Sequence, residues 1–248
     1  MKIETEILAE PVSFKITEIK AINPKIEPSV KLTARANFGL TIEEGNTEKR
    51  EVHFDGQFIS RTDKNRFTVG LEVDREETEG VETENEWLAQ TKYDYFLTEK
   101  WFISTNASFE KDDFKELRGR TVLGAGAGYQ LWETDLKNLA AGLGYARINE
   151  SFEEDFPDKD YSAIHSAMNF DYFLHKKIVQ FFHWNEVFLN TEDTEDIWLR
   201  TRTGLRFSLH KGFTWTMQYN FDWDADPAPG LDELDTKLLF TLGYNFGE

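Results

Sequence analysis

Apolar and polar residues alternate along most of this chain. The clearest run, from Phe213 to Trp223, has an aromatic residue or methionine at every odd position and a polar residue at every even one. A period of two is typical of a β-strand with one apolar and one polar face. Twelve runs of this kind lie between about Val30 and Phe246. We therefore predict an all-β chain of about twelve strands.

The connections between these strands also alternate, in length. Those after the second, fourth, sixth, eighth and tenth strands are short, whereas those after the third, fifth, seventh, ninth and eleventh are longer and acidic. The connection after the first strand is intermediate. A closed antiparallel transmembrane β-barrel has tight turns on one side of the membrane and longer loops on the other. An even strand number places both termini on the short-turn side, which in outer-membrane barrels is the periplasm.

We accordingly expect residues 30–248 to form a transmembrane β-barrel with short periplasmic turns and longer acidic extracellular loops. A soluble β-sandwich or lipocalin-like barrel also alternates and is the competing architecture. Its core would have to hold twelve strands' worth of Phe, Trp, Leu and Tyr, and its outer face would carry Arg, Asp and Gly. The mean hydropathy of −0.56 is compatible with a membrane barrel, because only one face of each strand is apolar.

The first 29 residues are different in character. Pro11, Pro24 and Pro28 interrupt them, and their apolar positions fit neither a helical nor a strand period. We expect residues 1–29 to be an N-terminal periplasmic extension, or a plug that enters the lumen. The formal net charge of −18 argues against nucleic acid as a partner, because phosphate binding needs a basic surface. The chain has no cysteine, so neither a disulfide framework nor a thiolate metal site can form.

A cluster of charges is expected inside the barrel. Arg200, Arg202 and Arg206 share the inward face of the tenth strand. If residues 210–212 form a hairpin loop with glycine in the left-handed position, Arg200 lies opposite Asp222. The loop centred near residue 193 then brings Glu186 beside Arg200. This lumen charge cluster is either a constriction that selects ions or small solutes, or a set of ion pairs that fills a closed barrel.

Aromatic side chains near the short turns have a simpler interpretation. Tyr95 and Trp101 are expected to face each other beside the turn at residues 98–99, and Phe213 and Trp215 follow another turn. Such rings lie at the level of the lipid headgroups in transmembrane barrels. We predict that these four residues belong to an interfacial aromatic girdle, in contact with outer-membrane lipid and lipopolysaccharide.

Two further chemistries are weaker candidates. The acidic loops offer oxygen ligands for divalent cations, but none has the ligand spacing of an EF-hand. His183 and Asn185 share the outer face of the ninth strand, and Ser162 and Ser166 the outer face of the eighth, as a lipid hydrolase on the outer wall would need. The register of the ninth strand is the least certain of the twelve, because its two faces are both partly apolar. We assign no catalytic, cofactor-binding or metal residue and expect neither enzymatic activity nor a cofactor.

Several segments carry a family resemblance. They are Gly39-Leu40-Thr41, Gly45-Asn46-Thr47, Asn65-Arg66-Phe67, Lys92-Tyr93-Asp94-Tyr95-Phe96-Leu97-Thr98 with Trp101, Ala107-Ser108-Phe109-Glu110-Lys111-Asp112, Arg120, and Gly124-Ala125-Gly126-Ala127-Gly128-Tyr129-Gln130. From about Phe38 to Phe246 the chain resembles the salt-induced outer-membrane protein family, also called domain of unknown function 481. The resemblance implies an outer-membrane β-barrel and supplies no catalytic residue.

These observations lead to one expected function and two alternatives. We expect an integral protein of the outer membrane of a Gram-negative-type bacterium. Its role would be that of a narrow passive pore for ions or small solutes, or of a structural barrel in envelope or salt stress. A binding or adhesion module acting through the acidic loops is the alternative, and a lipid hydrolase on the outer wall is a remote one. The sequence leaves the oligomeric state open.

Overall fold

The computed structural model describes residues 2–3, 12–13, 30–45, 48–153, 157–175, 177–228 and 230–247. Most of the extension expected over residues 1–29, including any plug, therefore lies outside the described residues. Within it, Lys2–Ile3 (β1) and Val12–Ser13 (β2) form an antiparallel pair.

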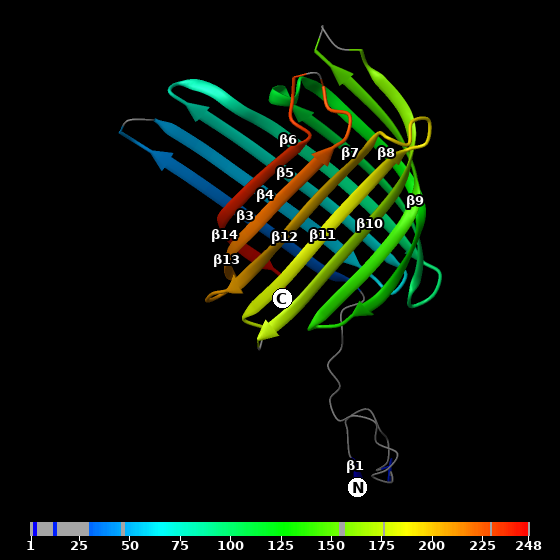
Figure 1. Ribbon diagram of the computed structural model, residues 1–248. Coiled ribbons are helices and arrows are strands. Elements are labelled where there is room, and N and C mark those ends of the chain that lie inside the picture. Colours follow the sequence, from blue (N-terminus) through cyan, green and yellow to red (C-terminus); the bar gives the residue numbers. More distant parts are fainter. Residues whose placement is uncertain are drawn as a thin grey trace.

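Twelve antiparallel strands close into a single barrel (Figure 1). Strands that follow one another in sequence are neighbours in the wall, and the last strand returns to the first. The predicted fold, a closed antiparallel barrel of twelve strands, is confirmed. The strands are β3 (Lys31–Glu43), β4 (Lys49–Arg61), β5 (Asn65–Thr78), β6 (Val81–Phe96), β7 (Trp101–Asp112), β8 (Leu117–Glu133), β9 (Lys137–Phe152), β10 (Lys159–His175), β11 (Val179–Asn190), β12 (Ile197–Ser208), β13 (Phe213–Asp224) and β14 (Leu234–Phe246).

The outer wall of the barrel is apolar. On β13, Phe213 is 57% exposed and Tyr219 is 45% exposed, whereas Thr214 and Thr216 between them are each 1% exposed. Leu143 and Leu242 are each 63% exposed on other strands. Exposed apolar side chains around the full circumference need a hydrocarbon solvent, because soluble proteins do not present apolar surface on this scale. No helix among the described residues is long and apolar enough to cross a membrane.

The two rims of the barrel differ as expected, with two exceptions. The connection after the fifth predicted strand was expected to be long but has four residues, 113–116, no more than the turns at 97–100 and 209–212. The short-turn rim has connections at residues 62–64, 97–100, 134–136, 177–178 and 209–212. The position before residue 177 is not described. The opposite rim, called the long-loop rim below, has loops at 153–158, 191–196 and 225–233. The connection after the third predicted strand was expected to be long but is a two-residue turn at Glu79 and Gly80, both with positive φ.

The short turn after the third predicted strand has a physical cause. β5 has 14 residues and β6 has 16, more than the ~9–11 that a tilted strand needs to span the hydrocarbon. Their glutamate-rich ends, expected to be a loop, remain paired as strands, with Glu76 opposite Glu84 and Thr78 opposite Val81. Figure 1 shows this hairpin extending outward at the long-loop rim.

The interior is not purely polar. Seven buried residues form an apolar cluster inside the wall of β8 to β12: Val122, Ala146, Ile148, Tyr161, Ala163, Phe188 and Trp198. A smaller cluster of Phe96, Phe102 and Ala140 lies toward the short-turn rim. The expectation that apolar residues point outward therefore has local exceptions, which narrow the space inside the barrel.

Candidate functional site in the barrel lumen

The predicted lumen charge cluster is centred on β12. Arg200 lies opposite Asp222 of β13 and opposite Glu186 of β11, as the loop lengths predicted. Gly212 has a φ of 83°, the left-handed conformation on which this register depends. Because strand side chains alternate, the same register turns Arg200, Arg202 and Arg206 inward together. Their exposed fractions are 4%, 9% and 3%.

The strongest partner of Arg200 comes from the opposite wall. Its Nη2 donates a hydrogen bond to Oε1 of Glu110 on β7 at 2.8 Å. Its distances to the expected partners are longer, 3.6 Å to Asp222 and 4.0 Å to Glu186. β8, β9, β10 and β11 separate β7 from β12 by the shorter way around the barrel. Arg200 and Glu110 therefore span the lumen rather than line one side of it.

Arg202 forms a second bridge. It donates to both carboxylate oxygens of Asp222, at 2.6 and 3.3 Å, and its Nε lies 3.5 Å from Glu72 of β5. Asn220 also donates to Glu72, at 3.4 Å. Arg206 donates to Gln180 of β11 at 2.6 Å. Bidentate pairing fixes the guanidinium plane, so these side chains are held in position rather than free in solvent.

A fourth arginine, which the sequence did not single out for the lumen, extends this layer toward the long-loop rim. Arg120 of β8 bonds to Glu150 at 2.5 Å and lies 3.6 Å from Glu110 and 3.5 Å from Asp224 of β13. Its guanidinium stands 4.8 Å from the ring centroid of Trp198. Glu110 thus accepts a hydrogen bond from Arg200 and forms an ion pair with Arg120, from two different strands.

The polar network continues toward the short-turn rim. Arg66 of β5 donates to Asp94 and to Gln130, each at 2.7 Å. The guanidinium of Arg66 also lies 5.1 Å from the ring of Phe96 and 5.2 Å from the ring of Phe102. Ionised groups are therefore present inside the barrel at both ends as well as at its middle.

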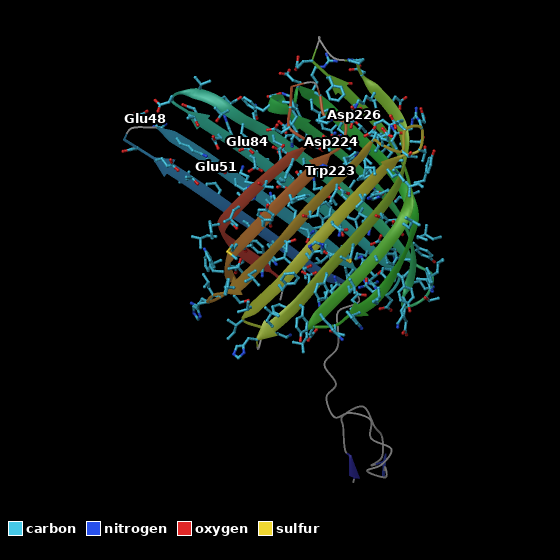
Figure 2. All side chains as sticks on the ribbon, viewed as in Figure 1. Glu48, Glu51, Glu84, Trp223, Asp224 and Asp226 are labelled. Atoms are coloured by element: carbon cyan, nitrogen blue, oxygen red, sulfur yellow. The ribbon has the colours of Figure 1, made fainter. Side chains whose placement is uncertain are left out.

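A separate charge cluster lies toward the long-loop end of β4 to β6. His53 contacts Asp74 at 2.9 Å and Asp55 at 3.2 Å. The ammonium of Lys237 on β14 contacts Asp74 at 2.7 Å, Glu84 at 2.8 Å and Glu51 at 3.1 Å. Figure 2 shows Glu51 and Glu84 in this region, away from Asp224 and Asp226.

Two groups in this region have ligand atoms close enough for one metal ion. They are His53 with Glu72 and Asp74, and Glu51 with Glu76 and Glu84. Ammonium groups already neutralise part of both sets, through Lys237 and through Lys49, which lies 2.8 Å from Glu76. Lysine side chains therefore already provide the positive charge that a metal ion would bring to these carboxylates.

The predicted girdle residues all lie on the outer wall near the short-turn rim. Trp101 packs edge-on against Tyr129 at 4.9 Å between ring centroids, and Phe213 packs against Tyr244 at 5.1 Å. Trp215 packs against Phe207 with the two rings tilted, at 5.1 Å between ring centroids. The expected facing of Tyr95 and Trp101 is wrong, because Tyr95 lies opposite Ile103 and Trp101 opposite Tyr129. The amide of Leu97 bonds to the carbonyl of Trp101, so the loop consists of residues 98–100 instead of 98–99, which shifts the pairing.

The acidic side chains of the long-loop rim are partly neutralised within the chain. Asp226 accepts a 2.7 Å bond from Lys159, and Asp235 lies 3.2 Å from Lys115. Glu154 and Asp155, also expected in an acidic loop, lie outside the described residues. These contacts join elements that are not neighbours in the wall, β10 with the β13–β14 loop and the β7–β8 connection with β14, and they leave fewer carboxylates for an added cation.

On the outer wall, the proposed hydrolase residues do not assemble as expected. His183 and Asn185 do face outward together, with 3.1 Å between Asn185 Nδ2 and His183 Nε2. The hydroxyl beside the imidazole belongs to Thr203, at 2.7 Å from Nδ1. Ser166 lies opposite Val187, and Ser162 accepts a bond from Arg147, so neither serine is next to His183.

Comparison with known proteins gives a family and a set of barrel structures. A family profile described as "Protein of unknown function, DUF481" matches residues 36–246. No curated protein sequence matches the chain. Among solved structures, the NanC porin is 9% identical with a TM-score of 0.49, over 88% of this chain and 99% of that chain.

Two further structures are similar to a comparable extent. The KdgM porin in complex with disordered oligogalacturonate is 12% identical, with a TM-score of 0.45, over 86% of this chain and 99% of that chain. The translocator domain of autotransporter NalP from Neisseria meningitidis is 10% identical, with a TM-score of 0.46, over 89% of each chain. These likenesses concern the course of the strands and say nothing about a solute for this chain.

Proposed function

The chain belongs to the DUF481 family, and we propose that it is an outer-membrane β-barrel that works as a narrow passive pore favouring small cations. The observation that carries the proposal is the ionised interior. Charged side chains occur from Lys49 and Glu76 at one end, through Arg202 and Glu72, to Arg66 near the other. A barrel that only had to be filled would need no such continuous polar lining.

The membrane part of the proposal follows from the wall and its rims. Apolar side chains are exposed around the barrel, aromatic rings gather near the short-turn rim, and both β3 and β14 reach that rim with their free ends. In bacterial outer-membrane barrels this rim faces the periplasm. We therefore propose that both ends of the barrel chain are periplasmic and that the outer wall contacts lipid and lipopolysaccharide.

The sign of the preferred ion follows from the charges near the long-loop rim. Glu51, Asp74 and Glu84 share one ammonium, that of Lys237. The chain as a whole carries a formal charge of −18. A cleft lined with excess negative charge concentrates cations at its entrance. Further from this rim, the side chains of Arg120, Arg200 and Arg202 form the narrowest part of the lumen. A cation must pass there between guanidinium groups and their carboxylates.

A second candidate is a structural barrel with no path through it. It is favoured by the bond between Arg200 and Glu110, which joins opposite walls, and by the apolar clusters that narrow the interior. Twelve strands lie between the ~8 whose interior side chains fill and the ~16 that leave an open channel. The number of strands alone therefore does not distinguish an open pore from a structural barrel.

Planar-bilayer recording of the purified full chain tests the proposal. A pore gives discrete conductance steps, with a reversal potential in a potassium chloride gradient that indicates cation preference. Absence of steps, in preparations whose folding is verified by the unfolding transition and by strand content, would reject the pore and favour the structural barrel.

A further inference from the structure

The seam where the barrel closes is paired over only part of its height. The ladder between β14 and β3 runs from Phe246 opposite Ala34 to Leu242 opposite Phe38 and stops there. On its other side β14 pairs with β13 as far as Leu234. Likewise β3 pairs with β4 along its whole length, to residue 43. In Figure 1, β3 and β4 lean away from β14 toward the long-loop rim.

Two strand edges are consequently unpaired on the same half of the barrel. They are residues 39–43 of β3 and 234–241 of β14. Every other seam between the described strands is paired along most of the shorter strand. In a bilayer, backbone N–H and C=O groups at an open edge have no water to bond. A barrel wall that only separated the lumen from the lipid would pair these backbone groups. The unpaired seam therefore indicates a further function.

The margins of the unpaired seam are apolar on the outside. Leu40 and Ile42 of β3 are 57% and 58% exposed. Leu238 and Phe240 of β14 are 56% and 54% exposed. An alkyl chain lying between these margins would replace contacts with lipid by equivalent contacts with protein.

The inside of the seam is closed by one lysine. Lys237 of β14 reaches past β3 to Glu51 of β4, Asp74 of β5 and Glu84 of β6. These ion pairs are what connects the two margins on the lumen side at this height. The carboxylates form a site for an ammonium group, which Lys237 itself now occupies.

We propose that the unpaired half of the β3–β14 seam is a lateral gate that binds a cationic amphiphile. Its ammonium head takes the place of the Lys237 ammonium among the three carboxylates. Its alkyl chain leaves through the seam, between Leu40 and Phe240, into the hydrocarbon. This inference rests on the proposed pore, since the head must enter the lumen.

The shape of the seam favours this occupant over an added β-strand. A strand inserted between two edges needs ~4.8 Å on each side over several residues. At Gly39 the margins already meet, because a Cβ there would lie 3.3 Å from Cγ2 of Thr241 and 3.5 Å from the carbonyl oxygen of Phe240. The two margins therefore converge at Gly39, which leaves no room there for a strand between them.

A disulfide bond that holds the seam closed tests the gate. The chain has no native cysteine that could react with the introduced pair. If the ladder were continued, Leu40 would lie opposite Phe240, so the pair Leu40→Cys with Phe240→Cys locks the seam shut. The matched control is Phe38→Cys with Leu242→Cys, one step further along the same margins but inside the existing ladder. The probes are methylammonium and decylammonium, whose primary ammonium groups keep the N–H donors of the lysine, used below micelle-forming concentrations as blockers of potassium current.

In the unmodified protein we expect decylammonium to block at a concentration at least tenfold lower than methylammonium does. Oxidation of the Leu40–Phe240 cysteine pair should remove that advantage and leave the methylammonium block, and reduction should restore it. The control pair should change neither. If the advantage survives in the locked protein, the gate is rejected.

Hydrogen exchange tests the open seam without depending on conductance. In bilayer nanodiscs, the amides of residues 39–43 that point toward β14 should exchange at least tenfold faster than the amides of residues 34–38 that point the same way, because the other amides of both segments stay bonded to β4. Lys237→Gln should widen the difference. Protection of both segments alike, or protection that appears only when two copies associate, would mean a closed seam or a docking edge and would overturn the proposal. Fast exchange without any current would retain the open seam, reject the pore and with it the amphiphile site.

Discussion

Arg200 on β12 and Glu110 on β7 are joined by a 2.8 Å hydrogen bond across the barrel, with exposed fractions of 4% and 2%. The pair is 90 residues apart in sequence. Both charged groups are buried from water, so each depends on the other to stabilise its charge. The bond therefore matters for stability as well as for the width of the lumen.

Replacing Arg200 by leucine should destabilise the barrel strongly. Glu110 would keep only Arg120 as a cationic partner, and Asp222 and Glu186 would lose a nearby charge. Removal of one partner of a buried ion pair costs about 3 to 5 kcal/mol. Urea unfolding in detergent measures the loss. The control Arg147→Leu removes an exposed pair with Asp160 and should cost at most about 1 kcal/mol. Equal losses in both variants would contradict the buried bridge.

Removing the charge of Arg202 and removing the charge of Asp222 should shift the ion preference in opposite directions. Arg202→Gln leaves the charges of Asp222 and Glu72 in the lumen, so the reversal potential should shift toward stronger cation selectivity. Asp222→Asn should shift it the other way. Asp135→Asn, at an exposed pair with Lys177 on the short-turn rim, serves as the control and should leave the reversal potential nearly unchanged. Shifts of the same sign in both lumen variants would count against the proposed selectivity mechanism.

The longest described loop should be held by a single lysine. Lys159 bonds to the carboxylate of Asp226 at 2.7 Å and to its backbone carbonyl at 3.0 Å. In Lys159→Met we expect cleavage within residues 225–233 by an added protease to be several-fold faster. Lys177→Met, on the other rim, is the control. An unchanged cleavage rate would show that the loop is held by other contacts.

Stability should carry a pH dependence from one buried loop carboxyl. Burial raises the pKa of Asp196, and a 2.9 Å hydrogen bond from Asn190 opposes this. A carboxyl whose pKa is raised by folding binds its proton more tightly in the folded state. Its stabilising contribution is therefore complete below the unfolded value of ~3.9 and is lost as the pH rises through the folded value.

The measurement is the urea midpoint at pH 4 and pH 7 for the wild type and for Asp196→Asn. The substitution should raise the midpoint at pH 7 relative to that at pH 4. A parallel change at both pH values would show that Asp196 does not titrate differently in the folded protein.

Local pattern was enough to predict the twelve strands, most of their outward faces and the register of β12 with both of its neighbours. Arg200 opposite Asp222 follows from a loop length and a period of two. The bond to Glu110 could not be predicted, because neighbours across a lumen depend on the stagger of all twelve strands. The ends of β5 and β6 were missed because glutamate-rich composition is typical of loops, although above the bilayer a strand needs no apolar face.

The central claim is that apolar side chains face lipid and charged ones face the lumen. Spin labels placed one at a time at residues 213 to 223 of β13, in liposomes, test it most directly. We predict that odd positions collide more with dissolved oxygen, which concentrates in the hydrocarbon, and even positions more with a water-soluble nickel complex. The reverse alternation, with Tyr219 shielded from oxygen and Asn220 in contact with lipid, would contradict the account.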